Sequence, residues 1–262
     1  MDLQLADKRV LVTGASRGIG LAIVRAFLAE GASVTATARR STPELEATGA
    51  TFVPADLATA DGPKRMLDAA LAVDPRLDVL VNNAGGGVMP AEAFGNPLDG
   101  EDAHWSGAFA LNLDAAVRTT RAALPSLIEA RGAVVNISSD SSRRPGSEPL
   151  PYSAAKAALN AFTRGLAERM AGSGVRVNAV SPSATRTDLI AGKDAYIAQV
   201  AAGLGVEHDV LVASLPKQTG MLTGTLIDPA EVARAVLLLA SPTMPSAIGG
   251  NWLVDAGATK IV

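Results

Sequence analysis

The chain has 262 residues, a length that suits one large α/β domain and is short for two, and 48% of its residues are apolar. Its formal net charge of −3 provides no strong field for nucleic acid or for an anionic membrane surface, so neither is expected as a partner. Cysteine is absent and only two histidines occur, which excludes disulfides and thiolate chemistry and predicts no metal site, so any chemistry must use oxygen, nitrogen or a cofactor.

The first nine residues carry Asp2 and Asp7 where a secretion signal needs basic residues. No later run approaches the roughly 18 uncharged apolar residues of a membrane span. We therefore expect a cytoplasmic protein without a transmembrane segment.

The chain opens with a pattern of strand, glycine-rich turn and helix. Residues 9–13 are apolar and β-branched, and residues 21–29 have a helical pattern. The glycines between them have the spacing G-x-x-x-G-x-G, which differs from the common G-x-G-x-x-G. Such a turn lets a pyrophosphate reach the N–H groups at a helix start, although many ordinary tight turns also contain glycine. The candidate contacts to a dinucleotide are Gly14, Ser16, Arg17, Gly18, Ile19 and Gly20.

The second predicted strand, residues 33–38, ends in Arg39 and Arg40. Sites for NAD usually carry an acidic residue about 20 positions after the glycines to bind the ribose 2′-hydroxyl, and none occurs here. Guanidinium groups match the oxygens of a 2′-phosphate, so NADP(H) is favoured over NAD(H), with Arg39 better placed than Arg40. The alternative is that both arginines are solvated.

Two further strands are predicted at residues 51–57 and 77–81. Asp56, followed by Leu57, ends the first of them, where the carboxylate could accept from an adenine amino group or cap the helix that begins near Asp61. The second is nearly all apolar, as a parallel sheet covered on both faces requires. The residues that follow it can line the flank of a cofactor or form a simple turn, and the candidates are Asn83, Ala84 and Gly85.

A long helical pattern covers residues 101–124 and is expected to stop before Pro125. Asn112 lies within it, where a polar amide is mildly unfavourable and so requires either exposure or a function. The fifth strand, residues 132–137, runs into a group of serines at 138–142. Hydroxyl groups at the carboxyl end of a central strand lie where open α/β sheets bind ligands.

Tyr152 and Lys156 begin a predicted helix at residues 151–171. A step of four residues places both side chains on one helix face. The lysine charge would lower the tyrosine pKa from about 10 toward neutrality, which makes proton transfer efficient. The alternative is a surface aromatic residue beside a solvated charge.

After a sixth strand at residues 175–180, the pattern is irregular from residue 184 to 228, and this segment is predicted to be a substrate lid. A helix at residues 229–240 and a last strand at 252–254 complete the pattern. Arg143 and Arg144 are expected to be solvated. The apolar residues of the lid fit lid packing or a subunit contact better than a substrate contact: Leu189, Ile190, Val200, Leu204, Val206, Leu211 and Leu215.

Strands that alternate with helices throughout the chain predict a doubly wound parallel sheet. Over essentially all 262 residues the sequence also resembles the short-chain dehydrogenase/reductase family. The resemblance rests on residues 13–20, on Asn-Asn-Ala-Gly at 82–85, on Asn112, on Asn-Ile-Ser-Ser at 136–139 and on Tyr152 with Lys156. It implies a single Rossmann-type domain over residues 1–262, with a mostly parallel seven-stranded sheet and helices on both faces.

The resemblance also implies an activity, namely hydride transfer between NADP(H) and a ketone or secondary alcohol. The family's serine stands thirteen positions before its tyrosine, and 152 − 139 = 13 selects Ser139. Tyr152 would donate the proton, and Ser139 would bind the same carbonyl oxygen. By the same resemblance, Lys156 would hold the nicotinamide ribose and Asn112 would organise a water molecule.

By the resemblance, Pro182 and Thr187 after the sixth strand would contact the cofactor, and Thr187 would bind the nicotinamide amide. Ser183 replaces a glycine that is usual after this proline, and Ala256 replaces the middle glycine of a usual Asp-Gly-Gly near the C-terminus. Family members usually form symmetric tetramers, so a homotetramer or a dimer is expected. The alternatives that remain open are an NAD-linked secondary alcohol dehydrogenase, a 3-oxoacyl thioester reductase and a non-catalytic dinucleotide-binding regulator.

Overall fold

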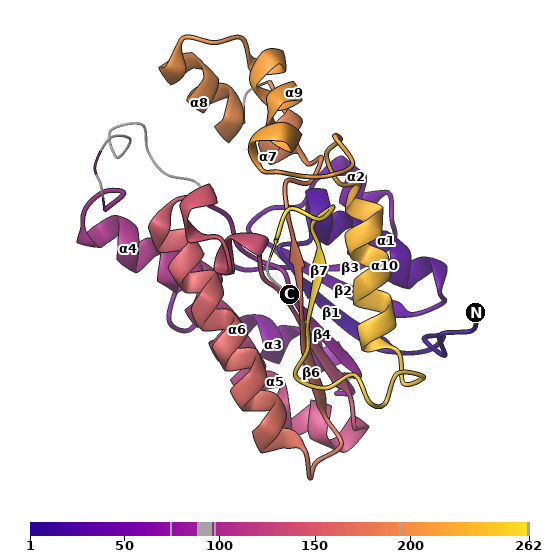
Figure 1. Ribbon diagram of the computed structural model, residues 1–262. Helices are drawn as coiled ribbons and strands as arrows, with labels where there is room; N and C mark the ends of the chain where they lie inside the picture. The colour runs from indigo at the N-terminus through magenta and orange to yellow at the C-terminus, as the bar shows by residue number, and fades with distance from the viewer. Residues whose placement is uncertain (74, 88–95, 97, 194, 261–262) are drawn as a thin grey trace.

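The computed structural model describes residues 1–73, 75–87, 96, 98–193 and 195–260. Its centre is a sheet of seven parallel strands in the order β3-β2-β1-β4-β5-β6-β7 (Figure 1). The strands are β1 Arg9–Thr13, β2 Ser33–Ala38, β3 Thr51–Pro54, β4 Val79–Asn82, β5 Ala133–Ile137, β6 Arg176–Pro182 and β7 Asn251–Val254. The prediction of a doubly wound sheet is confirmed, and within the described residues every strand pair is parallel. Strand order reverses between β1 and β4, where such sheets bind ligands at their carboxyl ends.

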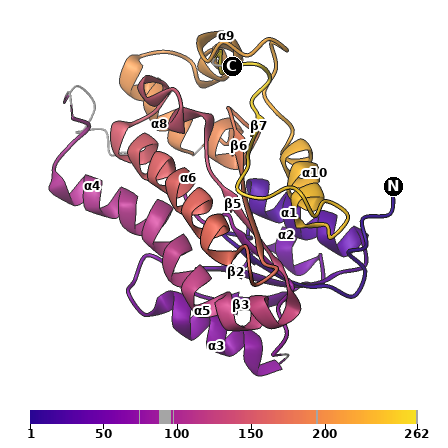
Figure 2. The ribbon, with the colours of Figure 1, turned by 60° about the horizontal axis from the view of Figure 1, so that its bottom comes forward.

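Helices cover both faces of the sheet (Figures 1 and 2). On one face α1 (Gly18–Ala29) packs against α10 (Pro229–Ala240), and on the other lie α3 (Gly62–Val73), α5 (Ala115–Ala130) and α6 (Leu150–Met170). Alternation along β1 serves both faces, because Val10 and Val12 belong to the first core and Leu11 to the second. The sequence predicted these layers because strands buried on two faces are apolar throughout.

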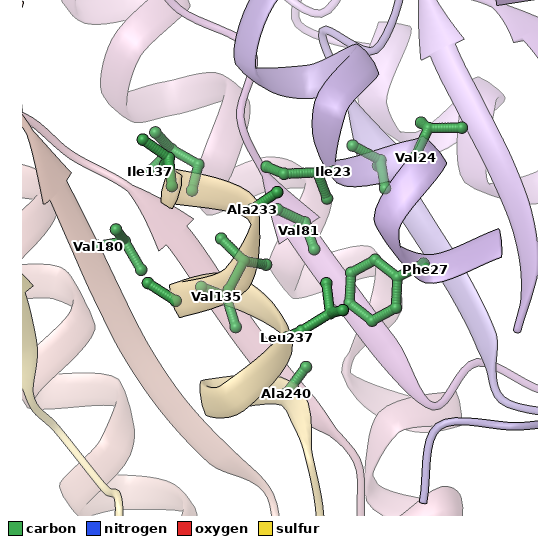
Figure 3. Packing of buried hydrophobic residues seen from close by; sticks show 14 of the residues in the cluster. Ile23, Val24, Phe27, Val81, Val135, Ile137, Val180, Ala233, Leu237 and Ala240 are labelled. Atoms are coloured by element: carbon green, nitrogen blue, oxygen red, sulfur yellow. The ribbon is translucent and has the colours of Figure 1, made fainter. Parts of the chain in front are cut away.

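Figure 3 shows the first of these cores at close range. Phe27 of α1 is fully buried and packs beside Leu237 of α10. The small side chains of Ala233 and Ala240 on α10 allow the two helices to approach closely, and Val81 and Val135 of the sheet lie beneath them. Burial of an aromatic side chain of this size contributes about 2–3 kcal/mol, so this contact anchors the helix that follows the glycine turn.

The predicted helix at residues 101–124 differs from the observed one. It consists of α4 (Asp102–Phe109), a π-helical turn η2 (Ala110–Asp114) and α5, which continues through Pro125 to Ala130. The expectation of an end before Pro125 is wrong because tertiary contacts lie beyond the proline. Leu127 is fully buried, and the Ser126 hydroxyl accepts from the Leu77 N–H at 2.8 Å and donates to the Pro75 carbonyl at 2.8 Å.

The segment predicted to be irregular at residues 184–228 contains three short helices. They are α7 (Asp188–Ala191), α8 (Tyr196–Leu204) and α9 (His208–Gln218), which lie together beyond the carboxyl ends of the strands (Figure 1, top). Gly205 ends α8 in the left-handed conformation, with φ of 66°. The remaining short helices are α2 (Pro43–Glu46), η3 (Asp140–Ser142) and η4 (Pro145–Ser147). No helix among the described residues is long and apolar enough to cross a membrane.

The C-terminal segment, residues 255–260, returns to the end of α9. The Leu222 N–H donates to the Ala256 carbonyl at 2.7 Å, and the Lys260 amine donates to the Gly220 carbonyl at 3.3 Å. Ala256 has φ of 52°, a left-handed conformation that strains a residue with a side chain. A glycine at this position, as the family usually has, would adopt it without strain.

Candidate active site

The carboxyl ends of the strands open onto a cavity of about 910 Å³. Its walls come from the glycine turn before α1, the loops after β4, β5 and β6, the helices α4 and α6, and the segment from Thr187 to Thr219. This is the position and size at which an open α/β sheet holds a ligand.

The glycine turn before α1 requires glycine because its backbone packs closely against neighbouring backbone atoms. Gly14 has φ of 63°, and a Cβ there would lie 2.8 Å from the Ala84 Cα, while a Cβ on Gly20 would lie 2.3 Å from the Gly14 carbonyl oxygen. The Asn83 side-chain amide braces the turn by donating to the carbonyls of Thr13 at 2.9 Å and Gly14 at 3.1 Å. Within the described part of the chain, no side chain caps the first turn of α1. Its N–H groups and the helix dipole therefore fit a pyrophosphate.

The predicted cofactor contacts divide into two groups. Those that line the cavity are Gly14, Arg17, Gly18, Ile19, Gly20, Arg39, Asn83, Gly85, Tyr152, Lys156, Pro182 and Thr187. Those that the structure places outside its lining are Ser16, Arg40, Asp56, Leu57 and Ala84. Both Arg39 and Arg40 are exposed at the end of β2, and Arg39 is the one directed to the cavity.

Asp56 is exposed, and its carboxylate accepts from the Ala58 N–H at 3.0 Å. The alternative role proposed for it, a cap of the helix beginning near Asp61, belongs to Thr59, whose hydroxyl accepts from the Gly62 N–H at 3.1 Å. Leu57 is buried in the core beside α3.

Tyr152 and Lys156, in the first turns of α6, both line the cavity. The Lys156 amine lies 5.6 Å from the centroid of the Tyr152 ring and donates to the Ile137 carbonyl at the end of β5 at 2.8 Å. Helical spacing thus brings the phenol and the amine to one face, and the end of a central strand orients the amine.

Asn112 lies in the π-helical turn η2 and is buried. Its side-chain oxygen accepts from the Gly86 N–H at 3.0 Å, and its amide donates to the carbonyls of Gly86 at 3.1 Å and Ala108 at 2.9 Å. A Cβ on Gly85 would lie 2.7 Å from the Asn112 oxygen and 3.1 Å from the Lys156 amine. Glycine is therefore required where the loop after β4 passes between these two side chains.

The two serines after β5 have different surroundings. The Ser138 hydroxyl donates to the Lys156 carbonyl at 3.2 Å and so holds α6 against β5. The Ser139 hydroxyl oxygen accepts from the Ser141 N–H at 3.2 Å and from the Ser141 hydroxyl at 3.0 Å. The Ser139 hydroxyl donates to the Asp140 carboxylate at 3.4 Å. Both serines line the cavity, and hydrogen bonding with Ser139 acts to lower the pKa of the Tyr152 phenol.

Burial, followed by the negative charge of Glu148, raises the pKa of Tyr152, and hydrogen bonding with Ser139 opposes this effect. The expectation that Lys156 lowers the tyrosine pKa is not met. Burial instead lowers the pKa of Lys156 itself to about 8. Removal of the phenol from water thus outweighs the nearby amine, and the phenol stays protonated at neutral pH.

Three charged residues around the phenol were not assigned to the site from the sequence. Arg144, which was expected to be solvated, is partly buried, and its guanidinium pairs with the Asp140 carboxylate at 2.8 Å and donates to the Thr219 carbonyl at 2.7 Å. Glu148 is exposed where it lines the cavity, yet enclosure there and the Asp140 charge raise its pKa to about 7, while Arg144 opposes this rise. The four-residue spacing from Asp140 to Arg144 is the signal that could have indicated their pairing.

The segment at residues 184–228 contributes only some of its apolar residues to the cavity. Leu189, Ile190 and Leu215 line it, whereas Leu204 and Val206 are exposed and Leu211 is buried. A Cβ on Gly18 would lie 3.1 Å from the Thr187 side chain, so the start of this segment faces the glycine turn.

Ser183 lines the cavity, and its N–H donates to the Val254 carbonyl at 3.2 Å. This bond continues the pairing of β6 with β7. Ser183 is not among the residues with positive φ, so its backbone does not require the glycine that is usual there.

Comparison of the sequence with known proteins identifies the family of this chain. The sequence profile described as short chain dehydrogenase matches residues 8–196. The uncharacterised oxidoreductase YvrD of Bacillus subtilis (strain 168) is 34% identical over 270 residues, with 99% of each chain covered. The 3-oxoacyl-[acyl-carrier-protein] reductase FabG of Chlamydia pneumoniae is 31% identical and covers 99% of this chain and 100% of its own.

Among solved structures, L-sorbose reductase from Gluconobacter frateurii, complexed with NADPH and L-sorbose, superposes with a TM-score of 0.88. It is 27% identical, and the match covers 100% of both chains. The chain therefore belongs to the short-chain dehydrogenase/reductase family, and it is an oxidoreductase of alcohol and carbonyl groups whose fold binds a nicotinamide dinucleotide.

Proposed function

We propose that this protein reduces a ketone with NADPH and oxidises the corresponding secondary alcohol in the reverse direction. The observation that carries the proposal is that Tyr152, Ser139 and Lys156 line the same cavity as the glycine turn and Arg39. When bound, the nicotinamide supplies the hydride in reduction and accepts it in oxidation.

Tyr152 donates its proton to the carbonyl oxygen as the alcohol forms. Its raised pKa keeps the proton in place until negative charge develops on that oxygen. Ser139 donates a hydrogen bond to the same oxygen and stabilises the developing charge. Tyr152 and Ser139 thus both act on the carbonyl oxygen of the substrate.

Lys156 returns a proton to the tyrosine and holds the nicotinamide ribose. With a pKa of about 8, its amine carries a proton near pH 7 and can release it readily. The Asn112 side chain and this amine both lie close to Gly85, and Asn112 organises the water through which the proton is replaced. Substitution of Tyr152, Lys156 or Asn112 would slow proton transfer and leave the fold in place.

Arg39 and Arg17 support NADP(H) over NAD(H). Both line the cavity at its glycine-turn end, and β2 ends in arginines where an NAD site usually has an acid. Guanidinium groups bind a 2′-phosphate through paired hydrogen bonds. The similar L-sorbose reductase was also solved with NADPH.

The residues from 184 to 228 are proposed to form a lid over the substrate, since part of this segment lines the cavity. The long helices α4, α5 and α6 are proposed to form the interfaces of a homotetramer. A 3-oxoacyl thioester remains the second substrate candidate, because FabG of Chlamydia pneumoniae is named for that reaction.

The reaction is tested with a panel of ketones, alcohols and a 3-oxoacyl thioester, assayed with NADPH or NADP while the absorbance of the reduced cofactor is followed. We expect Tyr152→Phe to lower kcat at least about 100-fold, because no other group can protonate the carbonyl oxygen. NADPH binding, measured by fluorescence, should change less than about threefold, since a phenyl ring keeps the packing. Thr51→Val, which removes an exposed hydroxyl group in β3 outside the cavity lining, is the control and should retain most activity. A Tyr152→Phe enzyme with normal kcat would remove the tyrosine from this role.

Cofactor preference is tested by fluorescence titration with NADPH and NADH. Arg39→Ala should weaken NADPH binding about tenfold and leave NADH binding almost unchanged, because only the 2′-phosphate loses its partner. Arg40→Ala, which changes a neighbouring arginine outside the cavity lining, should affect neither cofactor to this extent. Equal or tighter binding of NADH by the unmodified protein would discredit the assignment and favour an NAD-linked alcohol dehydrogenase.

A further inference from the structure

Glu148 lies two residues before the start of α6, four positions ahead of Tyr152. It lines the cavity, and its carboxylate is close enough that its charge acts more strongly on the phenol than any other charged group. When Tyr152 protonates the carbonyl oxygen of a substrate, a substituent on the carbonyl carbon would therefore come within reach of the Glu148 carboxylate.

Of the two acids near the phenol, only Glu148 is available to a ligand. Asp140 is buried and paired with Arg144, whose guanidinium also donates to the Thr219 carbonyl. In contrast, no hydrogen bond or ion pair engages the Glu148 carboxylate in the described part of the chain. The Asp140–Arg144 pair is neutral as a unit, so Glu148 gives this end of the cavity its negative charge once the pH exceeds the Glu148 pKa of about 7.

The cations that line the cavity lie elsewhere. Arg17 and Arg39 stand at the glycine-turn end, and the Lys156 amine is held by the Ile137 carbonyl. No other lysine or arginine lines the cavity among the described residues, and the sequence from residue 88 to 97 contains neither. A substrate carboxylate beside Glu148 would therefore meet a like charge, and the Arg144 guanidinium, whose charge acts on Glu148, is already paired with Asp140.

Two uncharged polar side chains, His104 and Gln218, line the same cavity as the Glu148 carboxylate. The His104 ring accepts the Glu101 N–H at Nδ1 at 3.0 Å, so in its neutral form the ring carries its proton on Nε2 and can donate it. The Gln218 amide donates to Ser214 at 2.9 Å, which leaves its oxygen as an acceptor. Both residues line the cavity. Groups that accept and donate in this way suit hydroxyl groups, each of which can do both.

We propose that Glu148 is a substrate-binding residue that accepts a hydrogen bond from a hydroxyl group of a neutral, hydroxylated carbonyl substrate and excludes substrates with a carboxylate in that position. The inference rests on the proposed function, because it places the reacting carbonyl at Tyr152. It goes further by naming the class of substrate and the residue that selects it.

The test uses three five-carbon ketones that differ only at the end of the carbon chain, each assayed with NADPH and the 262-residue protein at pH 8, where most of Glu148 is ionised. They are 5-hydroxy-2-pentanone, 2-pentanone and 4-oxopentanoate, which end in a hydroxyl, a methyl and a carboxylate. The unmodified enzyme should show kcat/KM about tenfold higher for the hydroxyl than for the methyl compound, and lowest for the carboxylate.

Two variants separate hydrogen bonding from charge. Glu148→Ala should bring the ratio of hydroxyl to methyl compound to within about twofold of unity, because the acceptor is lost. Glu148→Gln keeps an acceptor oxygen, so it should preserve much of that ratio while raising the ratio of carboxylate to methyl compound about tenfold. Each ratio cancels any effect of the substitution on folding or on the tyrosine, because these act on all three ketones alike.

Glu207→Gln, which neutralises an exposed acid at the start of α9, is the matched control and should leave both ratios unchanged. Ratios in the two Glu148 variants that stay within about twofold of the unmodified enzyme would overturn the proposal and leave the proposed function intact. The absence of NADPH oxidation with all three ketones would instead reject the proposed function, and the assignment of Glu148 would fail with it.

Discussion

Among single residues, Lys156 lines the cavity, and burial of its charged amine lowers the free energy of unfolding at neutral pH. Its side chain is buried, and burial lowers its pKa from the ordinary 10.5 to about 8. Between these two values the unfolded chain holds a proton that the folded chain has released, so stability rises with pH in this window. Below about pH 8 both states are protonated, and the unfavourable burial of the charge is present in full.

Lys156→Met should therefore stabilise the fold near pH 7 while it abolishes turnover. The pKa difference from 10.5 to about 8 corresponds to about 3 kcal/mol, and loss of the hydrogen bond to the Ile137 carbonyl offsets about 2 kcal/mol of this. Urea unfolding should show a net gain of about 1 kcal/mol near pH 7, and the gain should disappear near pH 10.

Lys217 is exposed, so Lys217→Met is the control and should change neither the free energy of unfolding nor the turnover. A Lys156→Met protein that is less stable than the unmodified one at both pH values would contradict this account of the buried charge.

The sequence predicted some site residues and missed others for a physical reason. Tyr152 and Lys156 are linked by helical spacing, which is local and therefore visible in the sequence. The environment of Arg144 depends on Thr219, 75 positions later, and this contact exists only in the folded chain. The direction of the tyrosine pKa was likewise missed, because it follows from burial and not from the neighbouring amine.

At the level of elements, Arg176 at the start of β6 holds the C-terminal end of α10. Its guanidinium donates to the carbonyls of Leu239 at 2.7 Å and Ala240 at 2.8 Å. The last carbonyls of a helix have no partner within the helix, and a cation there also interacts favourably with the helix dipole. Burial lowers the pKa of this guanidinium, which nevertheless remains charged.

Arg176→Met should lower the free energy of unfolding by about 2 kcal/mol, because the apolar side chain fills the space but leaves these buried carbonyls unpaired. Thermal or urea unfolding measures the change. Arg169→Met, at an exposed position near the end of α6, should change stability by less than about 0.5 kcal/mol. Equal stability of the two variants would show that solvent or other donors replace Arg176.

Element boundaries were predicted where the signals are local. The helix at residues 229–240 was predicted with its observed bounds, since Asp228 caps it, Pro229 starts it and Glu231 completes the capping box. The predicted helix end before Pro125 was wrong because the buried contacts of Ser126 and Leu127 stabilise the helix more than the proline destabilises it. The helices after residue 187 were missed because each is short and separated from the next by glycine, which masks the helical pattern.

For the molecule as a whole, the alternation of strands and helices was enough to predict the layers and the sheet. Parallel strands joined by helices must be covered on both faces, and this requirement produces the two cores. The arrangement of α7, α8 and α9 above the cavity could not be predicted in the same way. It depends on contacts with the loop after β5 and with the C-terminal segment, which are far apart along the chain.

The return of the C-terminal segment to the end of α9 has a practical consequence. Lys260 donates to the Gly220 carbonyl, so the described end of the chain lies beside the end of α9, whereas the N-terminus lies away from α7, α8 and α9 (Figures 1 and 2). An affinity tag or fusion partner attached after Lys260 would therefore crowd α9, which is part of the proposed lid. Recombinant protein for kinetic work should carry its tag at the N-terminus.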